Sequence, residues 1–262
     1  VYVAVAGTLA RIGVAMLKAH TRIGLRAVYE ILAETSLRVV PVVAACAAAG
    51  MVVAGLSMTG LGAKVVGLIF LIAGDHLFTA LLVAAVVTIL LGMGMPTPSV
   101  YILAAVLIAP ALTRLGATPL AANLFLVYFA SLSAMTPPVA VASFAAAPIA
   151  DANPVAISLN AVRIALTAFL LPFSFVFSGD LLLSGPLWSI VVGCLAAAAG
   201  VVFLCLAAEG YWRGRIGPGA RLLFAAAGLG LLAPSNVVRA GALLLGALVL
   251  AASLRVGRER GS

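Results

Sequence analysis

Charged side chains are scarce in this 262-residue chain. They make up 8% of its residues, against about 25% in a typical soluble domain. Hydrophobic residues make up 65%, and the mean hydropathy is +1.29. This composition excludes a soluble globular domain. The chain is therefore better divided into membrane spans than into soluble domains.

Metal-binding and catalytic motifs are also missing. The three cysteines, Cys46, Cys194 and Cys205, lie in apolar stretches without CxxC spacing, so we expect small buried side chains rather than disulfide or metal roles. No Ser/His pair, no twin aspartates and no HExxH sequence lie in the apolar segments, which argues against an intramembrane enzyme. The apolar start, Val1–Ala10, lacks the charged region and cleavage site of a signal peptide. We expect it to be the tail of an apolar span, and the chain to be the C-terminal piece of a longer protein.

Basic residues outnumber acidic ones and give a net charge of +8, but they gather toward both ends of the chain. Five lie in residues 1–38: Arg11, Lys18, Arg22, Arg26 and Arg38. Seven follow residue 209: Arg213, Arg215, Arg221, Arg239, Arg255, Arg258 and Arg260. Basic residues that flank apolar segments in this way are typical of a protein whose partner is the lipid bilayer. The sequence shows no basic groove with interleaved aromatic residues of the kind that would indicate nucleic-acid binding. Spacings of three and four predict a basic amphipathic helix in the membrane interface over 11–38.

Two long uncharged runs cover residues 77–113 and 115–150, which are 37 and 36 residues. About 20 helical residues span a bilayer core of roughly 30 Å, so each run is too long for one helix. Each also contains a break, at Gly92–Ser99 (GMGMPTPS) and at Ser131–Pro138 (SLSAMTPP). In hydrocarbon, broken backbone is tolerated only where it is buried or lines a cavity. Paired interruptions point to the binding site of a secondary transporter.

These patterns predict an all-α polytopic membrane protein with broken helices and a re-entrant helical hairpin. We expect a truncated span and the amphipathic helix in 1–38, a segment in 39–177 that the resemblance given below makes a transport-domain repeat, and C-terminal membrane helices with a basic tail in 178–262. The repeat contains a hairpin over 77–112 and a broken helix over 119–150. The expected apolar helices are Val39–Met58, Leu61–Gly74, Leu77–Leu91, Ser99–Leu112, Pro119–Ala134, Val139–Ala150, Val155–Phe177, Leu187–Ala207, Ala220–Ala233 and Ala240–Leu254.

The first break has the chemistry of a small-cation site. Gly92 and Gly94 permit backbone conformations that other residues avoid, and two prolines remove N–H donors. Freed carbonyls are hard oxygen ligands, helix C-terminal ends carry partial negative charge, and Thr97 and Ser99 add hydroxyl oxygens. The alternative is a kinked helix whose backbone groups are satisfied by its neighbours.

The second break repeats this pattern. Ser131, Ser133 and Thr136 supply oxygens, and Pro137-Pro138 forces the preceding residue into an extended conformation. A new half-helix beginning at Val139 would point its N–H groups toward an anionic carboxylate. The alternative is a simple proline kink.

Other polar residues in apolar segments leave two interpretations open. Asn123 is either a substrate donor or one side of an interhelical hydrogen bond. Arg163 lies eight residues into a span, where it either attracts substrate carboxylates or makes a structural pair or interfacial contact. Asp75-His76 is either a proton relay or a junction that simply reaches water.

Several short motifs carry a family resemblance. They are Gly92-Met-Gly-Met-Pro-Thr97, Tyr101-Ile-Leu, Ala109-Pro110-Ala-Leu, Pro119–Ala122, Leu124-Phe125, Tyr128-Phe129, Ser133–Val139 and Ile149–Pro154. In these the chain resembles the TRAP transporter family, and more narrowly the large membrane (permease) subunit of its TAXI-type branch. The resemblance covers 39–177 closely and the remainder more weakly.

The resemblance implies a fold and partners. It implies two inverted repeats, of which this chain holds the second, so that it is one half of an inverted-repeat ion-transporter-like fold. It implies a multi-pass protein of the bacterial cell inner membrane that takes up small organic acids with sodium by an elevator-type mechanism. The implied partners are a periplasmic substrate-binding protein of TAXI type and a small membrane subunit or the N-terminal half of a fused permease. Residues 1–262 alone are then expected to be inactive.

The site predictions combine both lines of reasoning. We expect sodium, the coupling ion, to be held mostly by backbone carbonyls at Gly92, Gly94, Thr97, Ser133 and Thr136. We expect substrate at Pro96, Ser99, Asn123, Pro137 and Pro138. The two breaks should then lie in contact. The rival interpretation, a non-transporting membrane scaffold, leaves both polar breaks unexplained, and a passive channel would favour rings of charge.

Overall fold

The computed structural model describes residues 6–8, 10–11, 13–14, 24–212, 214 and 216–259, and all regular elements in that part are helical. The all-α class is therefore confirmed. The chain divides into two compact units, Val1–Ala48 and Ala49–Ser262. The predicted truncated span and the first half of the amphipathic helix, with Lys18 and Arg22, lie largely outside the described residues.

The boundary between the units falls inside one long helix, α2 (Leu25–Met58). This helix ends where the predicted span Val39–Met58 ends, but it continues without a break through the predicted junction at residue 38. On its exposed N-terminal part, Arg26 Nε lies 3.1 Å from Glu30 Oε1, four residues on. Such exposed pairs stabilise a helix by about 0.3–0.5 kcal/mol.

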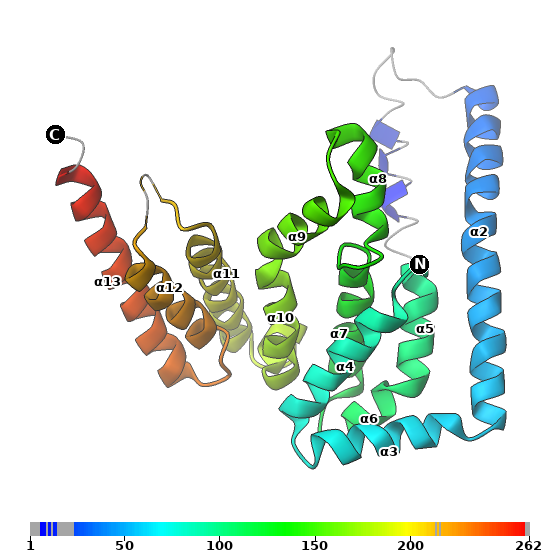
Figure 1. Ribbon diagram of the computed structural model, residues 1–262, viewed down its shortest axis with the longest axis horizontal. Coiled ribbons are helices and arrows are strands. Elements are labelled where there is room, and N and C mark those ends of the chain that lie inside the picture. The colour runs from blue at the N-terminus through cyan, green and yellow to red at the C-terminus, as the bar shows by residue number, and fades with distance from the viewer. Residues whose placement is uncertain are drawn as a thin grey trace. The chain divides into compact units, whose positions relative to one another are not determined.

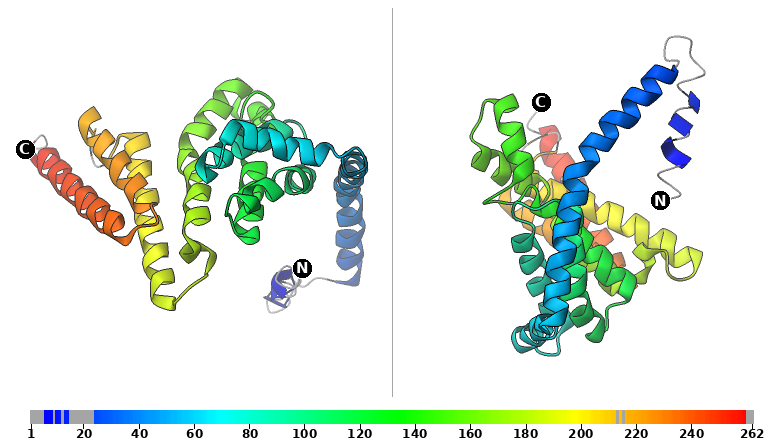
Figure 2. Two further views of the ribbon diagram at one scale, coloured as in Figure 1. Left: turned by 90° about the horizontal axis from the view of Figure 1, so that it is seen from below. Right: turned by 90° about the vertical axis from the view of Figure 1, so that its right-hand side faces the viewer.

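The second unit is built from short helices (Figure 1, Figure 2). They are α3 (Leu61–Ala73), α4 (Leu77–Leu91), α5 (Thr97–Leu107), α6 (Ala109–Arg114), α7 (Pro119–Ser133), α8 (Val141–Ala150), α9 (Pro154–Ile164), α10 (Leu166–Phe177), the 3-10 turn η2 (Gly179–Leu182), α11 (Leu187–Glu209), α12 (Pro218–Leu231) and α13 (Asn236–Glu259). Helix α4 has the predicted bounds, and the two breaks separate α4 from α5 and α7 from α8. A short helix on either side of each break is therefore confirmed, although the predicted arm Ser99–Leu112 is divided and α8 begins two residues later than predicted.

Two predicted helices are divided. The predicted arm Ser99–Leu112 breaks at Ile108, because Pro110 has no N–H for the carbonyl four residues before it and sits instead in the first turn of α6. The predicted span Val155–Phe177 breaks at Ala165, where α9 and α10 are bent by 44°. Among the described residues, α11 alone is a single helix long and apolar enough to cross a membrane, and α9 with α10 passes the same test as a bent pair.

The main core of the second unit lies between α3–α7 and α10. Its centre is aromatic: Phe125 on α7 is fully buried, 4.7 Å between ring centroids from Phe129 and 5.3 Å from Phe173 on α10. The Phe125–Phe173 pair is edge-to-face, and such pairs add about 0.5–1.5 kcal/mol beyond area burial. This packing fixes α7, which leads into the second break, against α4 and α5 on either side of the first.

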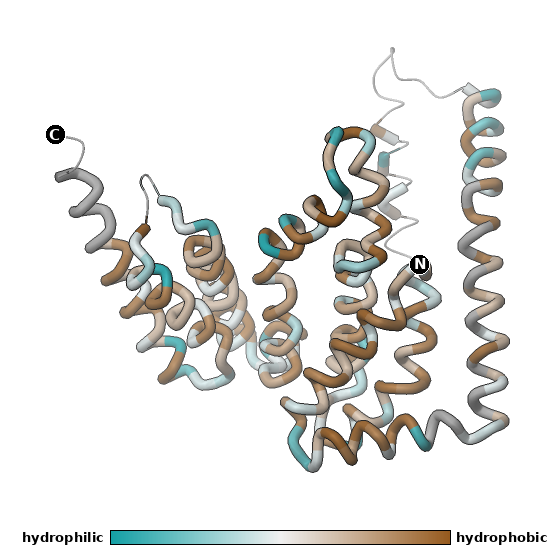
Figure 3. Tube along the Cα trace, viewed as in Figure 1, coloured by the Kyte–Doolittle hydropathy of each residue, from teal (hydrophilic) through white to brown (hydrophobic). Residues whose placement is uncertain are grey.

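A second core joins α11, α12 and α13, which lie side by side (Figure 1). Gly200 and Gly228 face each other across α11 and α12, since a Cβ on Gly228 would lie 3.0 Å from the Gly200 carbonyl oxygen. Small residues permit this close approach of membrane helices. Figure 3 shows hydrophilic positions mostly at turns and helix ends of this unit, with apolar residues along the helices.

The expectation that the three cysteines are buried is wrong. Cys194 and Cys205 are exposed on α11 and Cys46 is half-buried on α2. An apolar helix face that meets lipid accepts small apolar side chains as readily as a protein core does, so composition alone does not separate the two environments.

Candidate functional site

The two breaks lie in contact, as predicted. A Cβ atom added to Gly92 would overlap with the side chain of Ser133, at the end of α7. A Cβ on Gly94 would lie 3.7 Å from Cγ1 of Val139, just before α8. The first break therefore touches the second on both sides of the Pro137-Pro138 pair.

The backbone of the first break is only partly satisfied. The Gly92 N–H donates to the Thr88 carbonyl at 2.9 Å and closes α4, and Gly94 adopts a φ of +83° that favours glycine. Among the described residues, no backbone N–H donates to the carbonyls of Leu91, Met93 or Gly94. Unpaired carbonyls at a helix C-terminus are partially negative and are suited to a small cation.

The second break is similar. Thr136 N–H donates to the Ser133 carbonyl at 3.2 Å, which tightens the end of α7, and the Pro137-Pro138 peptide bond is cis. Within the described part, the carbonyls of Met135 and of both prolines accept no backbone hydrogen bond. Both breaks thus bring carbonyls without backbone partners into one region.

The hydroxyl groups differ in how free they are. Ser133 is 3% exposed and its Oγ donates to the Ala130 carbonyl at 2.7 Å, while Thr136 Oγ1 donates to the Leu132 carbonyl at 2.8 Å. Each donor keeps its oxygen lone pairs, so either hydroxyl can still coordinate a cation. Thr97 is half-buried at the start of α5, and its hydroxyl makes no hydrogen bond to any described residue. It is the least committed of the predicted oxygen ligands.

The start of α8 is not the open anion site that was expected. The helix begins at Val141 rather than Val139. Its Ala142 N–H donates to the Ala134 carbonyl at 2.9 Å, and its Ser143 N–H to the Ala140 carbonyl at 2.8 Å. Because these first-turn donors are already bonded, the structure gives little support to carboxylate binding by the α8 amides.

The predicted substrate residues are only partly together. Pro96 and Pro138 are exposed and Pro137 is half-buried at the two breaks, whereas Ser99 is 2% exposed. Asn123 lies ten residues before Ser133 in α7, about 15 Å along a helix.

The polar atoms of Asn123 already have partners. Its Oδ1 accepts from the Tyr101 hydroxyl at 3.1 Å, and its Nδ2 donates to the Pro119 carbonyl at 2.8 Å. This is the interhelical hydrogen bond that the sequence left open. A substrate role for Asn123 stays a prediction.

No charged side chain lies within either break, so their electrostatics come from helix ends and carbonyl dipoles. Asp75 and His76 form an exposed turn between α3 and α4. Arg163 is exposed and donates to the Ala208 carbonyl of α11 at 3.4 Å. This contact agrees with the structural interpretation of Arg163 that the sequence left open. Among the described residues, no group of three His, Cys, Asp or Glu side chains is placed to hold a metal ion.

Sequence reasoning missed one ion pair, between a buried arginine and a half-buried aspartate. Arg239 of α13 is 5% exposed, and its Nη1 lies 3.2 Å from Asp180 Oδ2 in η2. Its Nη2 donates to Ser178 Oγ at 2.9 Å and its Nε to the Ala233 carbonyl at 2.7 Å. The sequence did contain one indication of this pair, because Asp180 is the only acidic residue between Asp151 and Glu209.

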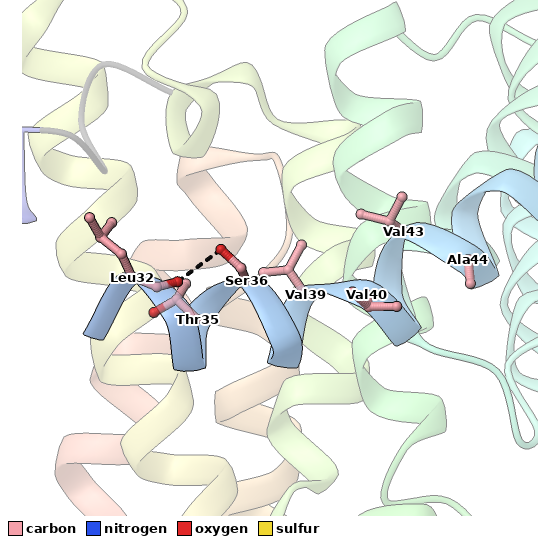
Figure 4. A pocket seen from close by; sticks show the side chains of 7 residues that line it. All are labelled: Leu32, Thr35, Ser36, Val39, Val40, Val43 and Ala44. Atoms are coloured by element: carbon pink, nitrogen blue, oxygen red, sulfur yellow. Dashed lines mark hydrogen bonds between the residues drawn. The ribbon is translucent and has the colours of Figure 1, made fainter. Parts of the chain in front are cut away.

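Two cavities elsewhere in the described part of the chain are lined mainly by apolar residues. A groove of about 540 Å³ follows one face of α2 (Figure 4), lined by Leu32, Thr35, Ser36, Val39, Val40, Val43 and Ala44. Its polar groups are engaged in part, since Ser36 Oγ donates to the Leu32 carbonyl at 2.8 Å. A second cavity of about 360 Å³ has Phe78, Phe173 and Phe177 among its lining residues. Neither combines several hydrogen-bonding groups with charge.

Comparison with known proteins supports the resemblance. The family described as "Tripartite ATP-independent periplasmic transporter, DctM component" matches residues 1–211. No curated protein and no solved structure matches the chain. The match covers both breaks and α11, and it ends before α12.

Proposed function

The chain belongs to the DctM family of tripartite ATP-independent periplasmic (TRAP) transporter components, and we propose that it supplies the half of the permease in which the coupling ion binds. Members of this family are integral membrane proteins of transporters, not enzymes, and work with a periplasmic binding protein and a small membrane subunit. The finer proposal is a sodium-coupled permease of TAXI type in the bacterial inner membrane. It takes up small organic acids by an elevator-type movement, together with a preceding half or subunit.

One observation carries the ion-binding part: Gly92 packs directly against Ser133. This contact brings two interrupted helices together, and each contributes carbonyls without backbone donors. A sodium ion held there would be ligated by the Gly94 carbonyl and by the Gly92 carbonyl, which also accepts from the Met95 N–H at 3.4 Å, with oxygens of Thr97, Ser133 and Thr136. Substrate would bind beside it, at the exposed Pro96 and Pro138 and the neighbouring Pro137.

Thr97→Val tests this site in the complete transporter. Valine keeps the branched shape and removes a predicted ligand hydroxyl that makes no hydrogen bond to the part of the chain that the structure describes. Loss of a ligand should raise the sodium concentration needed for half-maximal uptake by about tenfold, which corresponds to about 1.4 kcal/mol. The measurement is substrate uptake against sodium concentration, with the binding protein present and rates normalised to purified permease.

Thr113→Val is the matched control. Its hydroxyl donates to the Ala109 carbonyl at 3.1 Å, in α6 away from both breaks, so its sodium curve should match that of the parent. If Thr97→Val gives the parent's sodium curve as well, Thr97 does not bind the ion. If the complete assembly shows no sodium-driven uptake at all, the result favours the alternative of a non-transporting membrane scaffold.

A further inference from the structure

A cluster of opposite charges lies at the C-terminal end of α11. Arg221 of α12 donates from Nε to the Ala207 carbonyl at 2.8 Å and from Nη2 to the Ala208 carbonyl at 2.9 Å. Arg163 of α9 reaches the same Ala208 carbonyl at 3.4 Å. The last carbonyls of a helix carry partial negative charge, so they hold both guanidinium groups close together.

The two guanidinium groups keep most of their donors free. Each has five N–H donors, and the three contacts just described engage three of the ten. Arg163 is exposed and Arg221 is half-buried. Two guanidinium groups that contact one carbonyl oxygen bring two positive charges close together, an arrangement that suits a phosphate oxygen.

A carboxylate follows the shared Ala208 carbonyl in the chain. Glu209 follows Ala208 directly in the chain, is exposed, and forms no ion pair with any residue of the described part. Among the described residues, these side chains therefore supply two positive groups and one negative group. A zwitterionic ligand with a phosphate and an ammonium matches that set better than a simple anion does.

The surroundings indicate a lipid rather than a soluble ligand. Helix α11 is apolar and long enough to span a membrane, and the exposed Tyr211 and Trp212 follow it, as expected at the headgroup level. Val191, Leu195 and Val202 are 43%, 66% and 51% exposed on one face of α11. At 3.6 residues per turn Glu209 lies on that same face, so an exposed apolar stripe leads directly to the cluster.

We propose that Arg163, Arg221 and Glu209 bind the headgroup of a phospholipid that carries a primary ammonium, such as phosphatidylethanolamine. The phosphodiester lies at the two guanidinium groups and the ammonium at Glu209. The acyl chains lie along the exposed face of α11. This site is separate from the two breaks and does not depend on which ion or substrate is transported.

The test is native mass spectrometry of the purified full-length chain, titrated with phosphatidylethanolamine, phosphatidylcholine and phosphatidylglycerol of identical acyl chains. The parent should bind phosphatidylethanolamine tightest, because the quaternary ammonium of phosphatidylcholine cannot donate a hydrogen bond to Glu209. Arg163→Gln should weaken phosphatidylethanolamine and phosphatidylglycerol binding about tenfold, the effect of losing one charge-assisted contact. Glu209→Gln should remove the preference for phosphatidylethanolamine over phosphatidylglycerol.

Controls separate this site from general lipid adhesion and from misfolding. Arg26→Gln removes an exposed arginine on α2 and should leave all three affinities unchanged. Arg163 makes one 3.4 Å contact, so Arg163→Gln should unfold at the parent's temperature. Arg221→Lys keeps the charge but loses the fork, and should weaken binding even where folding is intact.

Free phosphoethanolamine distinguishes a lipid from a soluble phosphate. At the lipid concentrations used it should not displace bound phosphatidylethanolamine, because it lacks the acyl chains that follow α11. Equal affinity for the three lipids, or parent-like affinity in a folded Arg163→Gln variant, would overturn the proposal. Displacement by free phosphoethanolamine would assign the cluster to a soluble ligand instead.

Discussion

The contact between the two breaks predicts that Gly92 accepts no side chain. Its φ of −77° suits any residue, so the backbone does not require glycine here. Space does, because a Cβ on Gly92 would overlap with both Cβ and Oγ of Ser133. Since Ser133 is 3% exposed and its hydroxyl donates to the Ala130 carbonyl at 2.7 Å, it has no room to turn away.

The expected size of the effect follows from packing. Forcing a methyl group into a closely packed site costs about 1–3 kcal/mol of unfolding free energy. Ser133→Ala does not relieve the overlap, because its Cβ remains, but Ser133→Gly does. Ser133→Gly alone should cost about 1–2 kcal/mol through the lost hydrogen bond and the greater freedom of glycine. The double variant should lose less stability than the sum of the two single losses, by about 1 kcal/mol or more.

Reversible unfolding of the purified chain in mixed micelles, followed by circular dichroism, measures all four members of this cycle. Gly67→Ala in α3 is the matched control, because a Cβ there meets nothing within 4 Å. It should leave stability unchanged or raise it by up to about 1 kcal/mol. If Gly92→Ala behaves like Gly67→Ala, or if the cycle is additive, the breaks do not touch and the proposed ion site loses its geometric basis.

Two further changes probe contacts outside the breaks. Arg239→Met leaves Asp180 with Ser178 but without its basic partner, and because Asp180 is 23% exposed the loss should be below the about 3–5 kcal/mol known for fully buried pairs; adding Asp180→Asn should recover part of it in the same unfolding assay. Tyr101→Phe removes the 3.1 Å hydrogen bond to Asn123 and should lower stability by about 1 kcal/mol. Asn123→Ala in the Tyr101→Phe background should then cost less than it does alone, and strictly additive losses would show that the two side chains do not interact.

The two breaks could be predicted from the sequence because a lipid bilayer limits the length of an uninterrupted apolar helix. Uncharged runs of 37 and 36 residues exceed one span, and Gly and Pro lie near their middle. Helices α4 and α7 consequently begin at the predicted residues, and α7 ends within one residue of its prediction. The division between α5 and α6 could also have been predicted from the sequence, because Pro110 interrupts a helix that begins at Thr97.

Contacts between distant segments were less predictable. The sequence marked Arg163 and Asn123 as polar residues in apolar helices, but it did not say that they meet Ala208 and Tyr101. Pairing of Asp180 with Arg239 needs α13 to return beside η2, and no local pattern fixes that return. The bend at Ala165 has no proline or glycine to signal it, and Pro172 lies seven residues further on.

The contact at Gly92 also constrains how the breaks function together. Helix α4 ends against α7 through a glycine and a buried serine, so the polypeptide itself fills the space between the two helix ends. The oxygens that remain without backbone donors are then those of the turns that follow, at Met93 and Gly94 in one break and at Met135 and the two prolines in the other. A bound cation would therefore be coordinated by both turns, and the Gly92–Ser133 contact sets the distance between them. Ion affinity should consequently fall in any variant that separates these helices, even when every ligand oxygen is retained, and Gly92→Ala is the variant in which to measure it.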